Sequence, residues 1–180
     1  LSFAALVAMG FDPEAACARM PGVRLPASVM HVQALRTESG VQATLIDDSW
    51  NAEVMSMRNA MAFVRDYGRA GGGGNGAAPV ARRIAMLGRI VNLDHAAEAM
   101  HRSLAAPLLD SGIEHVVTHG QEMRWLREEM PASMLGPHFE SAAEAAGYLG
   151  AFLRDGDLLL VKGDRDRSDF GDIPELLQKL

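Results

Sequence analysis

The sequence contains a single cysteine, Cys17, among its 180 residues, so a disulfide within the chain is impossible. Because Cys17 lies in an alanine-rich segment with a helical pattern, we expect a small buried hydrophobic side chain in a reducing compartment. The sequence also has no apolar run of membrane-spanning length, and Leu1 to Met9 lacks the basic flank and small-residue cleavage site of a signal peptide. These absences predict a cytoplasmic protein with no membrane partner.

Positive charge is also scarce. The chain has 17 Lys and Arg against 23 Asp and Glu, and its net charge is −6. The basic residues are scattered, apart from Arg82-Arg83 and the segment from Lys162 to Arg167. Nucleic-acid phosphates require a basic stripe, so we exclude nucleic acid as a partner.

What the sequence does have is the composition of a globular protein, with 48% hydrophobic and 22% charged residues. Its length suits one domain, with or without a short preceding segment. The chain starts at Leu1, inside a segment that already has a helical pattern. We therefore expect it to be a piece of a longer protein.

The N-terminal part predicts helices followed by a strand hairpin and another helix. The turn-like residues Glu38-Ser39-Gly40 separate two apolar runs, which favours antiparallel pairing. The expected elements are helices at Ser2–Ala8 and Pro13–Met20, strands at Val29–Arg36 and Gln42–Ile46, and a helix at Ala52–Tyr67. The tract Gly71–Gly76 is too poor in apolar side chains to pack, and we expect a surface loop.

After this tract, predicted strands and helices alternate. The strands are Ile84–Leu87, His115–Thr118, His138-Phe139 and Leu158–Val161, and the helices are His95–Asp110, Gln121–Met130, Ala142–Arg154 and Pro174–Leu180. Such alternation predicts an α/β fold, a Rossmann-like, mostly parallel sheet with helices on both faces and an N-terminal antiparallel hairpin. Ligands bind beyond the carboxyl ends of such strands, which directs attention to the loops after Ile46, Leu87, Thr118 and Val161.

Three of these loops carry motifs in a recognisable order: D-D-S-W-N from Asp47, L-G-R-I-V-N from Leu87 with a later helical His101, and V-K-G-D-R from Val161. The order and spacing resemble the C-terminal domain of Mur ligases, in particular the type that adds D-alanyl-D-alanine to a UDP-muramoyl tripeptide. That type carries D-D-S-Y-N-A-N-P-x-S-M, L-G-x-M-L-E-L-G and V-K-G-S-R. Order and spacing together make a strong signal, although each motif alone is weak.

The resemblance implies an ATP-dependent carboxylate-amine ligase of peptidoglycan biosynthesis with three domains. In that family the central domain binds ATP and Mg²⁺ through a Gly-Lys-Thr loop, and a phosphorylated carboxylate is attacked by an amine to form the amide. The resemblance implies that residues 1–22 are the helical tail of that central ATPase domain and residues 23–180 are the C-terminal Mur ligase domain. The chain contains no Gly-Lys-Ser/Thr, so we expect this fragment to be inactive alone.

The resemblance also implies the site residues. Asp48, Asn51 and Trp50 are expected to bind the nucleotide, because a carboxylate at a strand end can accept hydrogen bonds from a ribose diol, an amide both donates and accepts, and an indole can stack on adenine. Trp50 plugging the sheet edge is an equal alternative. Without the resemblance, a turn or helix-capping role would be the better interpretation of Asp47 and Asp48.

Four residues are expected to contact the incoming amine substrate: Lys162, Arg165, His119 and Ser49. Lys162 and Arg165 place positive charge at the carboxyl end of a strand, where a substrate carboxylate or a transferring phosphate needs it. We expect His101 to hydrogen-bond a neighbouring loop rather than act as a base. Neither Ser49 nor Ser56 has a positioned His, so no catalytic residue is assigned in this chain.

The sequence departs from the family pattern at five positions, each at or beside a ligand-facing loop: Val29, Glu53, Val54, Arg89 and Asn92. Val29, or Ser28 beside it, stands where an Arg is usual, and only a re-routed loop would let Arg24 replace that Arg. Several departures change charge, so we expect an amine other than D-alanyl-D-alanine, and an impaired or specialised member stays open.

No metal site is predicted. The histidines lack zinc-ligand spacing, and Asp164 to Glu175 has Asp169 where a calcium loop requires glycine. The alternative function is a non-catalytic module of the same fold that binds a small molecule or a partner. A nicotinamide-dependent dehydrogenase is disfavoured, because no G-x-G-x-x-G follows a strand.

Overall fold

The computed structural model describes residues 3–19, 26–67 and 80–180. The predicted loop at Gly71–Gly76, Arg24 and the end of the predicted 1–22 tail lie outside these residues. The described part forms a six-stranded sheet in the order β1-β2-β6-β3-β4-β5. Its strands are β1 (His31–Arg36), β2 (Gln42–Asp48), β3 (Arg83–Gly88), β4 (His115–His119), β5 (Leu135–Phe139) and β6 (Leu158–Lys162).

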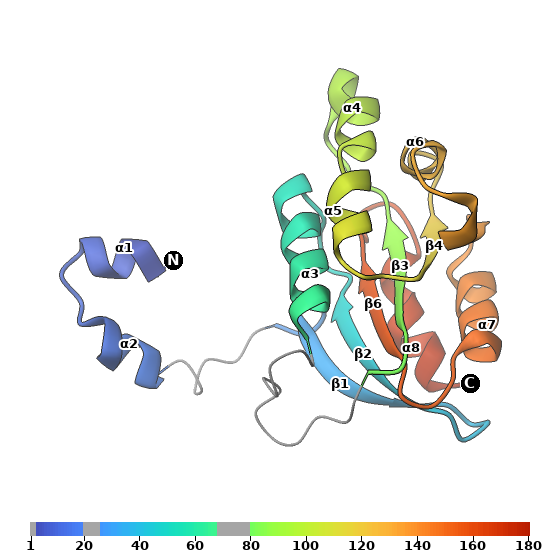
Figure 1. The fold of residues 1–180 in the computed structure, drawn as a ribbon, viewed down its shortest axis with the longest axis horizontal. Helices are drawn as coiled ribbons and strands as arrows, with labels where there is room; N and C mark the ends of the chain where they lie inside the picture. The colour runs from blue at the N-terminus through green and yellow to red at the C-terminus, as the bar shows by residue number, and fades with distance from the viewer. Residues whose placement is uncertain (1–2, 20–25, 68–79) are drawn as a thin grey trace.

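Only the β1–β2 pair is antiparallel, and every other pairing in this sheet is parallel (Figure 1). The helices are α1 (Phe3–Ala8), α2 (Pro13–Arg19), α3 (Val54–Asp66), α4 (Ala97–Arg102), α5 (Ala105–Asp110), α6 (Met123–Glu128), α7 (Ala142–Phe152) and α8 (Ile173–Gln178). Short 3-10 turns are η2 (Asp94–Ala96), η3 (Ala132–Met134) and η4 (Phe170–Asp172). The predicted fold class is confirmed.

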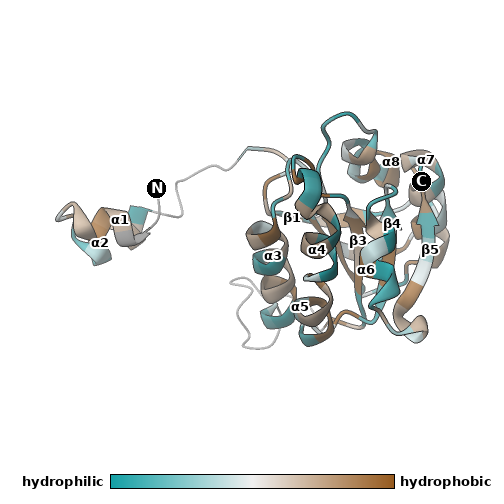
Figure 2. Ribbon diagram, turned by 90° about the horizontal axis from the view of Figure 1, so that it is seen from above, coloured by the Kyte–Doolittle hydropathy of each residue, from teal (hydrophilic) through white to brown (hydrophobic). Residues whose placement is uncertain are grey.

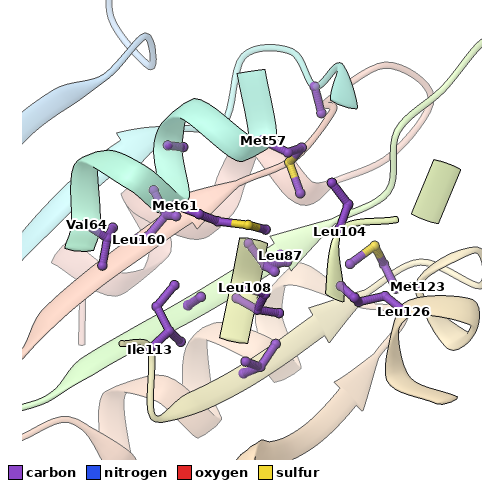
Figure 3. Packing of buried hydrophobic residues seen from close by; sticks show 14 of the residues in the cluster. Met57, Met61, Val64, Leu87, Leu104, Leu108, Ile113, Met123, Leu126 and Leu160 are labelled. Atoms are coloured by element: carbon purple, nitrogen blue, oxygen red, sulfur yellow. The ribbon is translucent and has the colours of Figure 1, made fainter. Parts of the chain in front are cut away.

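Alternating side chains of the buried strands build two cores, one on each face of the sheet. In β6, Leu158 and Leu160 pack in the core under α3, α5 and α6, whereas Leu159 and Val161 pack in the core under α7 and α8. Figure 2 shows the two groups of helices on opposite sides of the strands, and Figure 3 shows the first core, a cluster that includes Met57 and Met61 of α3 and Leu108 of α5. A strand buried on both faces needs apolar side chains at successive positions, which explains the run L-L-L-V in β6.

Three expectations about single elements were wrong. Cys17 was expected to be buried but is exposed, as part of a helix, α2, in which no residue is buried. The helix expected over His95–Asp110 is divided into η2, α4 and α5, and the break between α4 and α5 follows from Pro107, which lacks the N–H that would bond the Ser103 carbonyl one turn earlier. The strands other than β1 run further than predicted, whereas β1 begins at His31 and not at Val29. Parallel pairing with β6 continues through Asp47 and Asp48, which are the last residues of β2 and not a loop.

Gly163 follows β6 where the backbones of two strands approach closely. A Cβ atom at Gly163 would lie 2.6 Å from the Cα of Gly88 and 2.6 Å from the Phe170 ring. We expect Gly163→Ala to lower the free energy of unfolding by about 1–3 kcal/mol, because neither backbone nor a fully packed ring can move aside freely. Urea denaturation measures the change.

Gly147 of α7 supplies the matched control, because a Cβ atom there has nothing within 4 Å. Gly147→Ala is expected to raise stability by about 0.5–1 kcal/mol, since alanine loses less backbone entropy in a helix. If both variants had the same stability as the wild type, the close approach at Gly163 would not constrain this edge.

Candidate functional site

The carboxyl ends of the parallel strands bring polar residues to one level of the sheet. Asp48 at the end of β2 is in register with Lys162 at the end of β6, and Lys162 is in register with Leu87 of β3. Gly88 pairs in the same way with His119 at the end of β4. The residues that end the strands thus form a continuous carboxyl edge from Asp48 to His119, and this edge is the candidate site.

Asp48 and Lys162 form a buried ion pair at this edge. The Lys162 Nζ lies 2.8 Å from the Asp48 Oδ2, and the side chains are 3% and 9% exposed. The Lys162 Nζ also donates to the carbonyl oxygen of Asn51 at 2.7 Å, and the Asp48 Oδ1 accepts from the Met30 N–H at 3.1 Å. These contacts fix the Asp48 carboxylate against both the Asn51 turn and the segment that precedes β1.

Asp47, the residue before Asp48, has a structural role in the turn after β2. Its Oδ1 accepts from the Ser49 hydroxyl at 2.7 Å and the Ser49 N–H at 3.2 Å, and its Oδ2 accepts from the Ser28 hydroxyl at 3.1 Å. Ser49 is completely buried. Asp47 therefore shapes the turn that follows β2, as the turn interpretation predicted, and the Ser49 hydroxyl is directed toward Asp47 and away from the surface.

Four of the predicted site residues line one open groove of about 630 Å³: Asp48, Trp50, Asn51 and Lys162. Ser56, Asn59 and Phe63 of α3 also line this groove. Sequence reasoning missed Asn59 and Phe63 as groove residues, although the helical spacing of positions 56, 59 and 63 could have indicated a shared face. The lining of the groove therefore combines the charged pair of Asp48 and Lys162 with polar and apolar side chains of α3.

Trp50 and Arg165 meet beside this groove. The indole is 54% exposed, and the Arg165 guanidinium carbon lies 4.9 Å from the ring centroid. Trp50, Asn51 and Arg165 line a neighbouring groove of about 460 Å³ together with Val91 and Asn92. The loops after β2, β3 and β6 thus contribute jointly to the carboxyl edge, as predicted from the strand ends.

His119 lies in a separate pocket of about 490 Å³ at the other end of the edge. Its Nε2 lies 3.0 Å from the Asp169 Oδ1, and the other Asp169 oxygen accepts from the Ala142 N–H at the start of α7. Arg89 and Glu122 also line this pocket. The structure therefore does not bring His119 into the groove that contains Asp48.

Two departures from the family pattern have local structural roles. Arg89 donates to the backbone carbonyls of Asp166 and Arg167, both at 3.2 Å, and so ties the loop after β3 to the loop after β6. Glu53 is the N-cap of α3, and its N–H donates to the Ser56 hydroxyl at 3.0 Å. Neither role could be read from the sequence, because each depends on a neighbouring loop or a cap geometry.

Within residues 3–19, 26–67 and 80–180, no group of three or more His, Cys, Asp or Glu side chains could hold a metal ion. In the same part of the chain, no helix is long and apolar enough to cross a membrane.

The sheet order, the helices on both faces and the polar carboxyl edge define a Rossmann-like α/β domain with its ligand site beyond the strand ends. The sequence matches the family "Mur ligase, glutamate ligase domain" over residues 33–165, which is well over half of the chain. The chain therefore belongs to the Mur ligase family and contains its C-terminal, glutamate ligase domain.

Individual relatives agree with this assignment. UDP-N-acetylmuramoyl-tripeptide--D-alanyl-D-alanine ligase of Rickettsia prowazekii (strain Madrid E) is 21% identical over 121 residues, which are 67% of this chain and 24% of that protein. The chain thus spans about a quarter of the length of this relative.

Solved structures show the same fold. MurF ligase from Thermotoga maritima in complex with ADP has a TM-score of 0.69 and 14% identity, covering 98% of this chain and 36% of that one. MurF from Acinetobacter baumannii has a TM-score of 0.68 and 20% identity, and the match covers 97% of this chain and 35% of the solved chain. Both likenesses span little more than a third of the solved chains.

Proposed function

We propose that the chain is the C-terminal domain of an ATP-dependent amide-bond ligase of the Mur type, and that its groove at Asp48 binds the nucleotide ribose. The observation that carries the proposal is that the Asp48–Lys162 pair lines a groove together with Trp50 and Asn51. Family membership supports ligase chemistry, and a relative of this fold was solved in complex with ADP.

The chemistry of the groove suits a nucleoside. Each Asp48 carboxylate oxygen has two lone pairs, and the Met30 N–H and the Lys162 ammonium use one on each oxygen. The remaining lone pairs are available to the 2′ and 3′ hydroxyls of a ribose. Lys162 offsets the negative charge and holds the carboxylate in place, Trp50 presents an exposed indole face to the base, and Asn51 presents an exposed amide.

We assign the incoming amine to the part of the edge between Arg165, which lies over Trp50, and the separate pocket of His119. The exposed Arg165 guanidinium can pair with a carboxylate of the amine substrate, and the His119 pocket offers Arg89, Glu122 and Asp169 as charged partners. Lys162 and Ser49 are proposed to support the site indirectly and not by contact with the amine. Lys162 holds Asp48 and the Asn51 carbonyl in place, and Ser49 stabilises the turn after β2 through its hydrogen bond to Asp47.

The remaining parts of the proposal follow from the family. Residues 1–22 are the tail of a central ATPase domain and residues 23–180 are the domain proper. ATP and Mg²⁺ are bound mainly by that central domain, in the cytoplasm, for peptidoglycan biosynthesis. The contribution of this chain is to hold the ribose and orient the amine, so residues 1–180 alone are expected to have no ligase turnover.

The coding sequence upstream of Leu1 tests the proposal first. We expect a Gly-Lys-Thr phosphate loop about 200 residues N-terminal to this domain. The protein from the complete reading frame is then assayed for ATP-dependent phosphate release with a panel of amino acids and dipeptides, and one amine should stimulate release. An upstream sequence without a phosphate loop contradicts ligase function, and release that no amine stimulates supports the non-catalytic binding module.

A further inference from the structure

His101 is a completely buried histidine that lies outside the proposed ligand groove. It lies in the last turn of α4, and both of its ring nitrogens have backbone partners. The Ile90 N–H donates to the His101 Nε2 at 3.1 Å, and the His101 Nδ1 lies 2.7 Å from the carbonyl oxygen of Ala97. The expectation that His101 hydrogen-bonds a neighbouring loop is confirmed.

These partners determine the protonation state of the ring. A backbone amide can only donate and a backbone carbonyl can only accept, so the proton lies on Nδ1 and the Nε2 lone pair faces Ile90. A second proton on Nε2 would point directly at the Ile90 N–H. Protonation of His101 and this hydrogen bond therefore exclude each other.

The hydrogen bond reaches the carboxyl edge through one short loop. Ile90, Val91 and Asn92 line a groove of about 360 Å³ together with Asn51. Asn92 adopts a left-handed backbone conformation with φ of 58°, and the Asp164 N–H donates to the carbonyl oxygen of Arg89 at 3.2 Å. The position of Ile90 is thus linked to both Asn51 and the loop that contains Arg165.

We propose that neutral His101 is a positioning residue that holds the loop Arg89–Asn92 in its ligand-ready conformation, and that its protonation releases this loop. The role in ligand binding rests on the proposed nucleotide function, whereas the structural switch does not. The inference depends on the geometry of two backbone hydrogen bonds to one buried ring.

Burial favours the neutral form of His101, and the charged surroundings do not reverse this preference. Burial lowers the pKa of His101 below its ordinary value, and it outweighs the hydrogen bond to Ala97 and the field of Glu122, which both raise the pKa. Glu122 at the start of α6 is itself 3.5 Å from the Arg89 guanidinium, and the α6 group facing the ring is the neutral Trp125, with centroids 5.8 Å apart. Arg102 beside it on α4 is paired with Glu98.

The lowered pKa fixes the direction of the pH effect. Above the ordinary histidine pKa of about 6.5, the folded and unfolded states are both neutral at this residue, and the stabilisation is fully present. As the pH falls below that value, the unfolded state binds the proton first, so folding stability decreases. The hold on the loop is lost at still lower pH, where the pH reaches the lowered pKa of His101 in the folded protein.

The switch is tested in the wild-type protein by NMR from pH 7.5 to pH 5, that is, from about one unit above the ordinary pKa to about 1.5 units below it, the side toward which burial moves the pKa of His101. We expect the ¹⁵N shifts of His101 to report the Nδ1–H form at neutral pH. Exchange of the Ile90 amide, corrected for its intrinsic pH dependence, should accelerate about tenfold as His101 titrates, which corresponds to the loss of one hydrogen bond. A neutral ring with its proton on Nε2 overturns the proposal. So does an exchange rate of the Ile90 amide that does not change as His101 becomes protonated.

A second experiment tests the role of His101 in ligand binding. It compares the Kd for ADP of the wild type and of His101→Gln, both in the protein from the complete reading frame. Glutamine can accept from the Ile90 N–H at every pH, so the ratio of ADP Kd values, wild type over variant, should rise about tenfold toward pH 5. His95→Gln, at an exposed position of η2, is the control and should follow wild type. A ratio of Kd values that does not change with pH contradicts the role of His101 in ADP binding. If ADP does not bind at any pH, the proposed nucleotide function is refuted. The NMR result still decides whether protonation of His101 releases the loop.

Discussion

Lys162→Met is expected to lower the free energy of unfolding by about 3–5 kcal/mol, because it leaves the Asp48 carboxylate buried without its ammonium partner. The Lys162 and Asp48 side chains are only 3% and 9% exposed, so water that reaches the carboxylate from the groove replaces only part of the lost stabilisation. Methionine keeps the length and apolar stem of lysine, so the lost charge and its hydrogen bond to the Asn51 carbonyl account for the change. Urea denaturation of wild type and variant measures it.

A double-mutant cycle separates the ion pair from other effects. Combining Lys162→Met with Asp48→Asn should recover part of the lost stability, because a neutral amide is less costly to bury than an unpaired carboxylate. Lys179→Met is the matched control, since Lys179 and Glu175 form an exposed pair at 2.6 Å and should matter little. A Lys162→Met variant as stable as the control would contradict the structural importance of the buried pair.

Asp48→Asn is expected to weaken ADP binding about ten- to a hundredfold, because hydrogen bonds from a ribose diol to a carboxylate are stronger than those to a neutral amide. The amide oxygen can still accept from the Met30 N–H, but the amide NH₂ then faces the Lys162 ammonium, so urea denaturation of the single variant is measured alongside to separate lost binding from lost stability. Isothermal titration with the protein from the complete reading frame measures the Kd.

Asp47→Asn supplies the control for this experiment. Asp47 is an equally buried neighbour, but its oxygens accept from Ser28 and Ser49, and it does not line the groove. We expect the ADP affinity of Asp47→Asn to stay within about threefold of wild type, because Asp47 does not contact the groove. The small loss allowed reflects the hydrogen bonds to Ser28 and Ser49 that a single amide oxygen cannot replace. Equal losses in the two variants would mean that Asp48 acts only through the turn.

The carboxyl edge could be predicted from the sequence because it depends on local patterns. Apolar runs mark the buried strands, and in a parallel sheet their polar ends come to the same side. The strand pattern directed attention to the loops after Ile46 and Val161, and the resemblance to Mur ligases then implied Asp48, Asn51, Lys162 and Arg165 as site residues. The structure places the four residues along neighbouring grooves.

The contacts within the edge could not be predicted, because they join segments far apart in the chain. The pairing of Asp48 with Lys162 requires β2 and β6 to be neighbours, although β3, β4 and β5 lie between them in sequence. The same limit hid the link from Arg89 to the loop at Asp166. It also separated His119 from the other site residues, since nothing local shows that β3 lies between β4 and β6.

The central claim is that the Asp48 carboxylate accepts the ribose hydroxyls, and one measurement tests it most directly. ADP and 2′,3′-dideoxy-ADP are titrated into the wild type and Asp48→Asn forms of the protein from the complete reading frame. The account predicts that removing both hydroxyls weakens wild-type binding about ten- to a hundredfold but changes the binding of the variant by only a few-fold. An equal loss in both proteins would contradict the account, because the hydroxyls would then be bound elsewhere.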